Sequence, residues 1–226
     1  MRGHPSGWPQ RFWSYDLRAI VYIDGFNLYY GSLKRNPDLK WMNPKILVEK
    51  IFPEIDVLSL KYFTAYVTDR PNDPTQSQRQ QTYFRALKTI PNFEIIRGHY
   101  LSHTVSMPLE TPVNGERYAK VIKTEEKGSD VNLATMMLVD CFQNKFDVAV
   151  LISNDSDLTL PLSMVRGMFK KQAYVINPQM GKDRSIQLGR NCDRHRDIRK
   201  GHLIAAQFPN PVVDSKGEIH RPPSWS

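Results

Sequence analysis

Short apolar runs with the composition of buried β-strands alternate along this chain with segments that have helical periodicity. Strands are predicted, in chain order, at residues 19–24, 58–67, 93–101, 147–153 and 172–177, with 172–177 as the last strand of the sheet. Helices are predicted at residues 26–33, 44–51, 78–89, 131–143 and 158–169. Neighbouring strands joined through a helix run parallel, because the helix carries the chain back across the sheet. The alternation therefore predicts an α/β fold with a central, mostly parallel sheet.

Helix-start signals precede two of the predicted helices. Asn43 and Pro44 suit the cap and first position of the helix at 44–51. Ser129 or Asp130 is expected to cap the helix at 131–143.

The length of 226 residues suits one domain with appendages. We expect an irregular N-terminal arm at 1–18, an α/β domain at 19–181 and a basic extension at 182–226. The stretch 102–118 contains two prolines and a glycine, which favours an excursion or hairpin outside the core, and a short strand is expected at 119–122.

No apolar run approaches the roughly 20 residues of a membrane span, and the N-terminus lacks the apolar region of a secretory signal. With only two cysteines, the expected compartment is the cytoplasm. The chain has 31 Lys and Arg against 23 Asp and Glu, a net charge of +8, which favours a polyanionic partner such as nucleic acid.

Four aspartates are predicted to meet at one edge of the sheet. Asp24 ends the first strand, Asp155 and Asp157 follow the strand at 147–153, and Asp130 opens the helix that leads into that strand. The carboxyl ends of parallel strands share one edge, where such folds bind ligands. Two like charges about 4 Å apart repel by about 4 kcal/mol at an effective dielectric constant near 20. Oxygen ligands with no histidine or cysteine nearby suit Mg²⁺ or Mn²⁺.

A cation held in this way polarises a phosphoryl oxygen and lowers the pKa of a bound water, which together with the basic chain predicts phosphodiester hydrolysis. Each aspartate also has a structural interpretation. Asp24, Asp130 and Asp157 suit turns or helix caps, whereas Asp155 is the hardest to explain as a turn residue. Glu125 and Glu126 are expected to be solvated.

Three stretches, 21–31 (VYIDGFNLYYG), 123–138 (KTEEKGSDVNLATMML) and 148–162 (VAVLISNDSDLTLPL), resemble the signature motifs of the NYN domain family. This family lies in the PIN-like nuclease superfamily, and the resemblance is greatest to its bacterial LabA-like branch, which the stretch 79–101 also resembles. The resemblance covers residues 20–178. It implies a PIN-like three-layer α/β/α sandwich and ribonuclease chemistry that depends on Mg²⁺ or Mn²⁺.

The resemblance assigns catalytic roles to Asp24, Asn27, Asp130, Asp155 and Asp157, with the four aspartates as metal ligands. All four acids are present. Where many relatives have glycine before the third-motif acid, this chain has asparagine at position 154. Several relatives act as homodimers or beside partner proteins, so a homodimer is an open expectation.

Substrate contacts are expected around these acids. Asn27 could orient a water or a phosphate, or could be a cap. Lys123 and Lys127 could contact the RNA backbone, or could be solvated. Tyr29 and Tyr30 could stack on a base, or pack in the core or at its rim.

Other enzyme classes lack their motifs. A haloacid-dehalogenase phosphatase needs a second Asp two residues after the first, where this chain has Phe26. G-x-G-x-x-G, the P-loop motif and G-x-S-x-G are all absent, which argues against a dinucleotide-dependent dehydrogenase, a P-loop NTPase and a serine hydrolase. The alternative left open is a non-catalytic, regulatory module that binds RNA or a protein.

Overall fold

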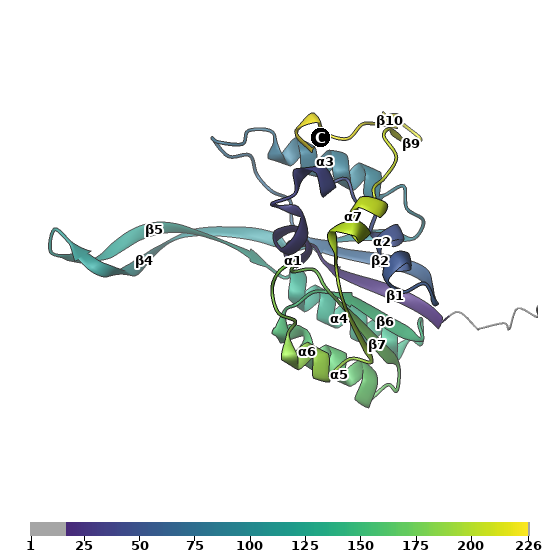
Figure 1. Ribbon diagram of the computed structural model, residues 1–226. Coiled ribbons are helices and arrows are strands. Elements are labelled where there is room, and N and C mark those ends of the chain that lie inside the picture. Colours follow the sequence, from purple (N-terminus) through teal and green to yellow (C-terminus); the bar gives the residue numbers. More distant parts are fainter. Residues whose placement is uncertain (1–16, 226) are drawn as a thin grey trace, which may run out of the picture.

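A six-stranded parallel sheet forms the centre of the molecule in the computed structural model, which describes residues 17–225 (Figure 1). The strands lie in the order β3-β2-β1-β6-β7-β8, and each neighbouring pair is parallel. Their bounds are Leu17–Asp24 for β1, Ile55–Thr64 for β2, Phe93–Arg97 for β3, Val148–Ile152 for β6, Gln172–Asn177 for β7 and Arg194–Asp197 for β8. The predicted α/β class and parallel sheet are confirmed.

The central strands bury side chains on both faces of the sheet. Along β1, Ala19, Val21 and Ile23 face one core, whereas Ile20 and Tyr22 face the other. Helices cover both faces, so every side chain of this strand from Ala19 onward is removed from water. This explains why the strand is an unbroken apolar run instead of an alternating one.

Helices form one layer on each side of the sheet (Figure 1). One layer contains α2 (Pro44–Ile51), α3 (Gln76–Leu87) and α7 (Lys200–Ala205), and the other contains α4 (Ser129–Phe142), α5 (Thr159–Gly167) and α6 (Ile186–Arg190). The result is the predicted three-layer α/β/α arrangement, which is consistent with a PIN-like fold. No helix within residues 17–225 is both long and apolar enough to span a bilayer.

Two helix starts differ in how well the sequence predicted them. Asn43 caps α2 as predicted, because its side-chain oxygen accepts hydrogen bonds from the backbone N–H groups of Lys45 and Ile46. The predicted helix at 26–33 is in fact α1 (Gly25–Leu28) followed by a π-helical turn (Tyr29–Leu33). Short 3-10 turns occur at Pro37–Leu39, Ser156–Leu158 and Pro223–Trp225.

The prediction that 172–177 is the last strand is wrong, because β8 follows it and pairs with β7. Strand β8 (Arg-His-Arg-Asp) has no apolar run, and as an edge strand it buries few side chains, so its sequence gave no strand signal. The predicted basic extension at 182–226 thus supplies one edge of the sheet. It also contributes α6, α7 and a hairpin of β9 (Val212–Asp214) and β10 (Gly217–Ile219), and buries Trp225.

A long antiparallel hairpin of β4 (His99–Val113) and β5 (Glu116–Lys127) projects from the body (Figure 1). The predicted hairpin outside the core is confirmed, but the predicted strand 93–101 is divided. Strand β3 ends at Arg97, and the chain turns out of the sheet at Gly98. The strand expected at 119–122 is the middle of β5. The predicted arm at 1–18 falls outside the described residues except for 17 and 18, which begin β1.

Candidate functional site

Asp24 and Ser153 leave the sheet side by side, because β1 and β6 are adjacent and Ile23 pairs with Ile152. The Asp24 side chain is almost fully buried, with 5% of the residue exposed. Its Oδ2 accepts a hydrogen bond from the Ser153 hydroxyl at 2.9 Å, and its Oδ1 accepts one from the backbone N–H of Asn27 at 2.9 Å. The carboxylate is therefore held in one orientation at the carboxyl edge of the sheet.

Burial raises the pKa of Asp24 from 3.8 to about 6, even though both hydrogen bonds favour the charged form. The negative charges of Asp130 and Asp155 raise this pKa further. Within residues 17–225, none of the three forms an ion pair with lysine or arginine. No neighbouring lysine or arginine among the described residues therefore balances the negative charge of the Asp24 carboxylate.

The loop after β6 presents Asp155 through local hydrogen bonds. Its backbone N–H donates to the Ser153 hydroxyl at 3.1 Å, and its Oδ1 accepts from the N–H of Asp157 at 3.0 Å. Asp155 thus caps the 3-10 turn that leads into α5, while Asp157 is exposed on that turn. Ser153 connects Asp24 and Asp155, a role that the sequence analysis missed although the serine directly precedes the N-D-S-D stretch.

Asp130 lies in the first turn of α4. Incomplete hydration raises its pKa, and the charges of Asp155, Glu126 and Asp157 raise it further. Asp130 therefore lies near enough to Asp155 for their charges to interact.

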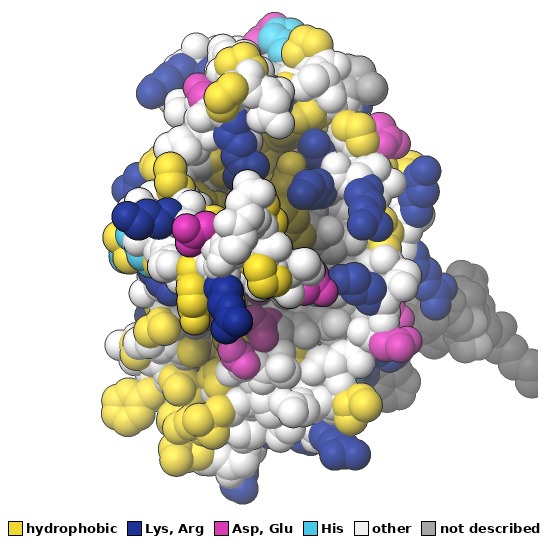
Figure 2. Space-filling view, turned by 90° about the vertical axis from the view of Figure 1, so that its left-hand side faces the viewer, with side chains coloured by type: hydrophobic (Ala, Val, Ile, Leu, Met, Phe, Trp, Pro, Cys, Tyr) yellow, Lys and Arg dark blue, Asp and Glu magenta, His cyan; other side chains and the backbone are white. Residues whose placement is uncertain are grey.

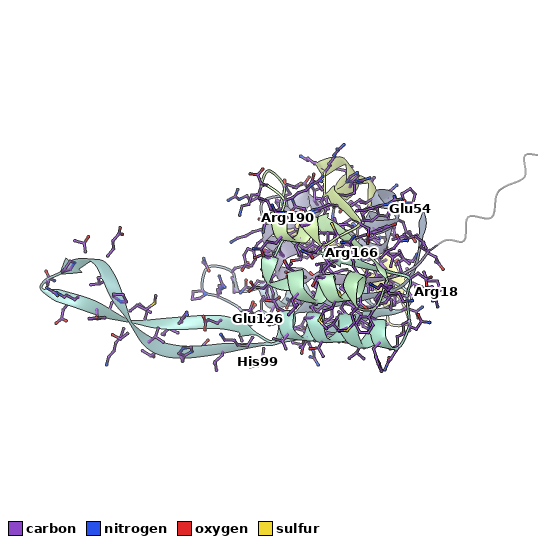
Figure 3. The ribbon with its side chains drawn as sticks, turned by 90° about the horizontal axis from the view of Figure 1, so that it is seen from below. Arg18, Glu54, His99, Glu126, Arg166 and Arg190 are labelled. Carbon is purple, nitrogen blue, oxygen red and sulfur yellow. The ribbon has the colours of Figure 1, made fainter. Side chains whose placement is uncertain are left out.

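The start of α4 differs from the prediction. Gly128, in a left-handed conformation, occupies the cap position, and Ser129 and Asp130 are the first residues of the helix. The Glu126 carboxylate provides the capping bonds, accepting from the Ser129 N–H at 3.1 Å and from its hydroxyl at 2.7 Å. The expectation that Glu126 is simply solvated is therefore wrong. Figure 3 shows Glu126 and His99 where the hairpin joins the body.

Asn27 joins three segments at the site. Its Oδ1 accepts hydrogen bonds from the Asn154 N–H at 3.3 Å and from Gln179 Nε2 at 3.2 Å. Asn154 in turn binds the segment after β7, donating to the Asp183 carbonyl at 3.0 Å and accepting from the Ser185 N–H at 2.7 Å. Gln179 and Asn154 therefore hold the loops around the acids, which the sequence did not indicate.

Lys123 and Lys127 lie on β5 and share one acidic partner. Glu125 contacts Lys123 Nζ at 2.6 Å and Lys127 Nζ at 3.1 Å, and these hydrogen bonds lower the pKa of Glu125 to about 2. Lys127 pairs with His99 at the base of the hairpin, near the start of α4. Glu125 therefore balances part of the positive charge of the two lysines that were predicted to contact the substrate.

The acids face a common edge without forming a closed metal cage. Within the described residues, no group of three or more His, Cys, Asp or Glu side chains is arranged closely enough to hold a metal ion. Figure 2 shows acidic side chains in a shaded hollow on this face, with Lys and Arg side chains around it. Oxygen donors with uncompensated charge suit a hard cation that keeps part of its water shell, as Mg²⁺ does.

A cavity lies next to Asp24, and the following residue forms part of its wall. Gly25 and Phe26 line this cavity of about 290 Å³ together with Tyr29 and Tyr30. Both tyrosines are exposed, Tyr29 to 36% and Tyr30 to 56%, so neither packs in the core. Any side chain at position 25 would come within 2.7 Å of the Tyr62 ring, so glycine is required where the site meets this cavity.

Comparison with known proteins identifies a family and shows similarity to a curated relative and to a solved structure. Residues 18–199 match the model of the NYN domain family. The chain is 33% identical to "6-hydroxy-3-succinoylpyridine 3-monooxygenase HspA" of Pseudomonas putida (strain DSM 28022 / S16), over 92% of this chain and 75% of that protein. The crystal structure of VPA0982, a protein of unknown function from Vibrio parahaemolyticus RIMD 2210633, superposes with a TM-score of 0.52 at 16% identity, covering 86% of this chain and 98% of that one. The last comparison supports the fold alone.

Proposed function

Because this chain belongs to the NYN domain family, we propose that it is a ribonuclease that hydrolyses RNA phosphodiester bonds with a carboxylate-bound Mg²⁺ or Mn²⁺ ion. The observation that carries the proposal is the environment of Asp24. Its carboxylate is buried, fixed by two hydrogen bonds and repelled by Asp130 and Asp155. A divalent cation would relieve that repulsion.

Because the acids are not close enough for three of them to contact one ion directly, Asp24, Asp130 and Asp155 would hold it partly through the water molecules that the ion keeps, with Asp157 on the exposed side. When bound, such an ion polarises a phosphoryl oxygen and lowers the pKa of a water molecule. The Ser153 hydroxyl holds the Asp24 carboxylate and the backbone N–H of Asp155. Asn27 keeps the loops after β6 and β7 together, so it acts as a positioning residue.

The net charge of +8 supports an RNA substrate, since counterion release favours nucleic acid on a basic protein. Lys123 and Lys127 are proposed contacts to phosphates near the cleaved bond. Their shared partner Glu125 would compete with the RNA for both of them.

The test is cleavage of labelled single-stranded RNA by the purified chain with Mg²⁺ or Mn²⁺, and with EDTA. We expect cleavage only with metal, and a loss of at least about 100-fold for Asp155→Asn. Asp56→Asn is the matched control, because Asp56 is an exposed aspartate at the opposite end of the sheet, in the second position of β2. Cleavage that survives EDTA or Asp155→Asn would contradict the site. RNA binding without cleavage in any metal would favour the regulatory module instead.

A second candidate function comes from the relative named as a monooxygenase, which is 33% identical over most of this chain. The aromatic cavity beside Asp24 would accept a ring-shaped substrate. A monooxygenase puts one oxygen atom of O₂ into its substrate and reduces the other to water with two electrons from a donor. Incubation with 6-hydroxy-3-succinoylpyridine, O₂ and NADH, followed by mass spectrometry with ¹⁸O₂, tests it. Unchanged substrate would exclude this reaction with that donor.

A further inference from the structure

The cavity beside Asp24 has walls made largely of aromatic rings. Its rings come from distant parts of the chain: Phe26, Tyr29 and Tyr30 from α1 and the π-helical turn, Tyr62 from β2, Tyr83 and Phe84 from α3, Tyr100 from the base of the hairpin, and Trp225. Tyr29, Tyr30 and Tyr100 keep exposed surface, so ring faces and edges remain available at the mouth. Such walls accept a planar ring by stacking or edge-to-face packing.

Positive charge exceeds negative charge around the same cavity. Lys34, Lys40, Arg70 and Arg79 line it, and Asp73 is the one acid among its described lining residues. Arg79 forms an ion pair with Asp73, in which Arg79 Nη2 lies 2.5 Å from the Asp73 carboxylate. Within residues 17–225, Lys40 and Arg70 form no ion pair, so the cavity holds unbalanced positive charge.

Lys40 is the cation most closely associated with the aromatic walls. Its Nζ lies 5.6 Å from the centre of the Tyr29 ring and 5.9 Å from the centre of the Trp225 ring. Burial lowers the pKa of Lys40, and the charge of Arg79 lowers it further. An anion bound beside Lys40 would oppose both effects, because its negative charge favours the charged form of the lysine.

We propose that this cavity binds a planar aromatic ring that carries an anionic group. The aromatic walls would hold the ring, and Lys40 would hold the anion, because it has no acidic partner among the described residues whereas Arg79 is already paired with Asp73. The volume of about 290 Å³ is at the small end of ligand cavities, which suits a ligand no larger than one mononucleotide. The ligand would lie next to the acidic edge, because Gly25 and Phe26 form part of the wall.

Two sources share this chemistry: a nucleotide, free or as one unit of a single-stranded RNA, and a small aromatic carboxylic acid. Both can be tested by calorimetry on the whole chain in EDTA buffer. The probes are AMP, UMP and nicotinate, with adenosine, uridine and nicotinamide as uncharged counterparts and inorganic phosphate and acetate as anions without a ring. We expect at least one charged ring to bind about ten-fold or more tightly than its uncharged counterpart and its isolated anion. Whichever probe binds identifies the source.

Two substitutions place the binding in this cavity. Lys40→Met keeps the apolar stem and removes the charge, and it should weaken the charged ring about ten-fold while leaving its uncharged counterpart unaffected. Tyr29→Ala should weaken both the charged and the uncharged ring. Lys50→Met, at an exposed position on α2, is the control and should change neither.

The proposal fails if no charged ring binds more tightly than its uncharged counterpart, or if Lys40→Met leaves a folded protein with unchanged affinity. The wild-type comparison of charged and uncharged rings decides the matter even if a variant does not fold. Because the assay contains no metal and needs no turnover, it is independent of RNA cleavage.

Discussion

The Ser153 hydroxyl donates a hydrogen bond to Asp24 Oδ2 at 2.9 Å and accepts one from the backbone N–H of Asp155 at 3.1 Å. Ser153 is fully buried at the end of β6, beside the end of β1. One small side chain therefore fixes the relative position of two acids that are 131 residues apart in the chain. This arrangement makes the proposed site sensitive to the loss of a single oxygen atom.

Ser153→Ala should reduce the stability of the protein by about 1–3 kcal/mol, because it leaves a buried carboxylate oxygen without its partner. RNA cleavage should fall more than stability alone explains, since Asp24 and Asp155 lose their common support. Urea unfolding and cleavage rates measure the two effects. Ser106→Ala, on the exposed hairpin, is the control. A stable, fully active Ser153→Ala protein would show that the bridge is dispensable.

Asp24→Asn should stabilise the metal-free protein above pH 6. The pKa of Asp24 is about 6 in the folded state and 3.8 without the fold, so the folded state binds the proton more strongly. The stability of the wild type therefore falls as pH rises from about 4 to 6, and the variant avoids a loss of up to about 3 kcal/mol.

Urea unfolding in EDTA between pH 4 and 8 measures the difference between Asp24→Asn and wild type, which should grow with pH. Added Mg²⁺ or Mn²⁺ should raise the melting temperature of the wild type and leave that of the variant almost unchanged, because bound metal stabilises only a fold that holds it. If the stabilities of the variant and the wild type changed with pH in parallel, the pKa of Asp24 would not be raised by folding.

Glu125→Gln should strengthen RNA binding by a few-fold. The change releases Lys123 and Lys127 from their common acid, and each free lysine that meets a phosphate displaces a counterion. Filter binding at several salt concentrations should give a steeper salt dependence for this variant and a shallower one for Lys127→Ala. Equal slopes for both variants and the wild type would place these lysines away from the RNA.

His195 should make the protein sensitive to acid. Its Nε2 is buried without a hydrogen-bond partner among the described residues, and burial lowers its pKa from 6.5 to about 4. The folded state favours the neutral ring, so this contribution to stability is complete above pH 6.5 and is lost as pH falls towards 4. Unfolding of His195→Phe measured against the wild type should show the difference shrinking or reversing over that interval. An unchanged difference would mean that the imidazole is hydrated.

The central part of the fold could be predicted because its signals are local. The runs that became β1, β6 and β7 are apolar on both faces, and such a run needs helices on both sides of the sheet. The same logic placed Asp24 and Asp155 at one edge, since parallel strands end together. The start of helix α2 could be predicted from Asn43, its cap residue, and Pro44, its first residue.

Strand β8 and the hairpin could not be predicted in the same way. Strand β8 is held by its backbone pairing with β7, and its alternating exposed and half-buried polar residues carry no apolar pattern. The hairpin strands are exposed on both faces, so their backbone pairing determines their length, whereas their hydrophobicity does not.

By itself, the sequence determined the parallel sheet, the succession of central strands and helices along the chain, and the edge at which Asp24 and Asp155 lie. The tertiary structure alone decided how deeply Asp24 is buried, that Ser153 joins it to Asp155, and that Glu126 caps α4. It also decided that Gly25 and Trp225, which are far apart in the chain, line the same cavity. The physical reason is range: strand and helix patterns depend on neighbours a few residues apart, whereas burial, pKa and cavity walls depend on side chains brought together from opposite ends of the chain.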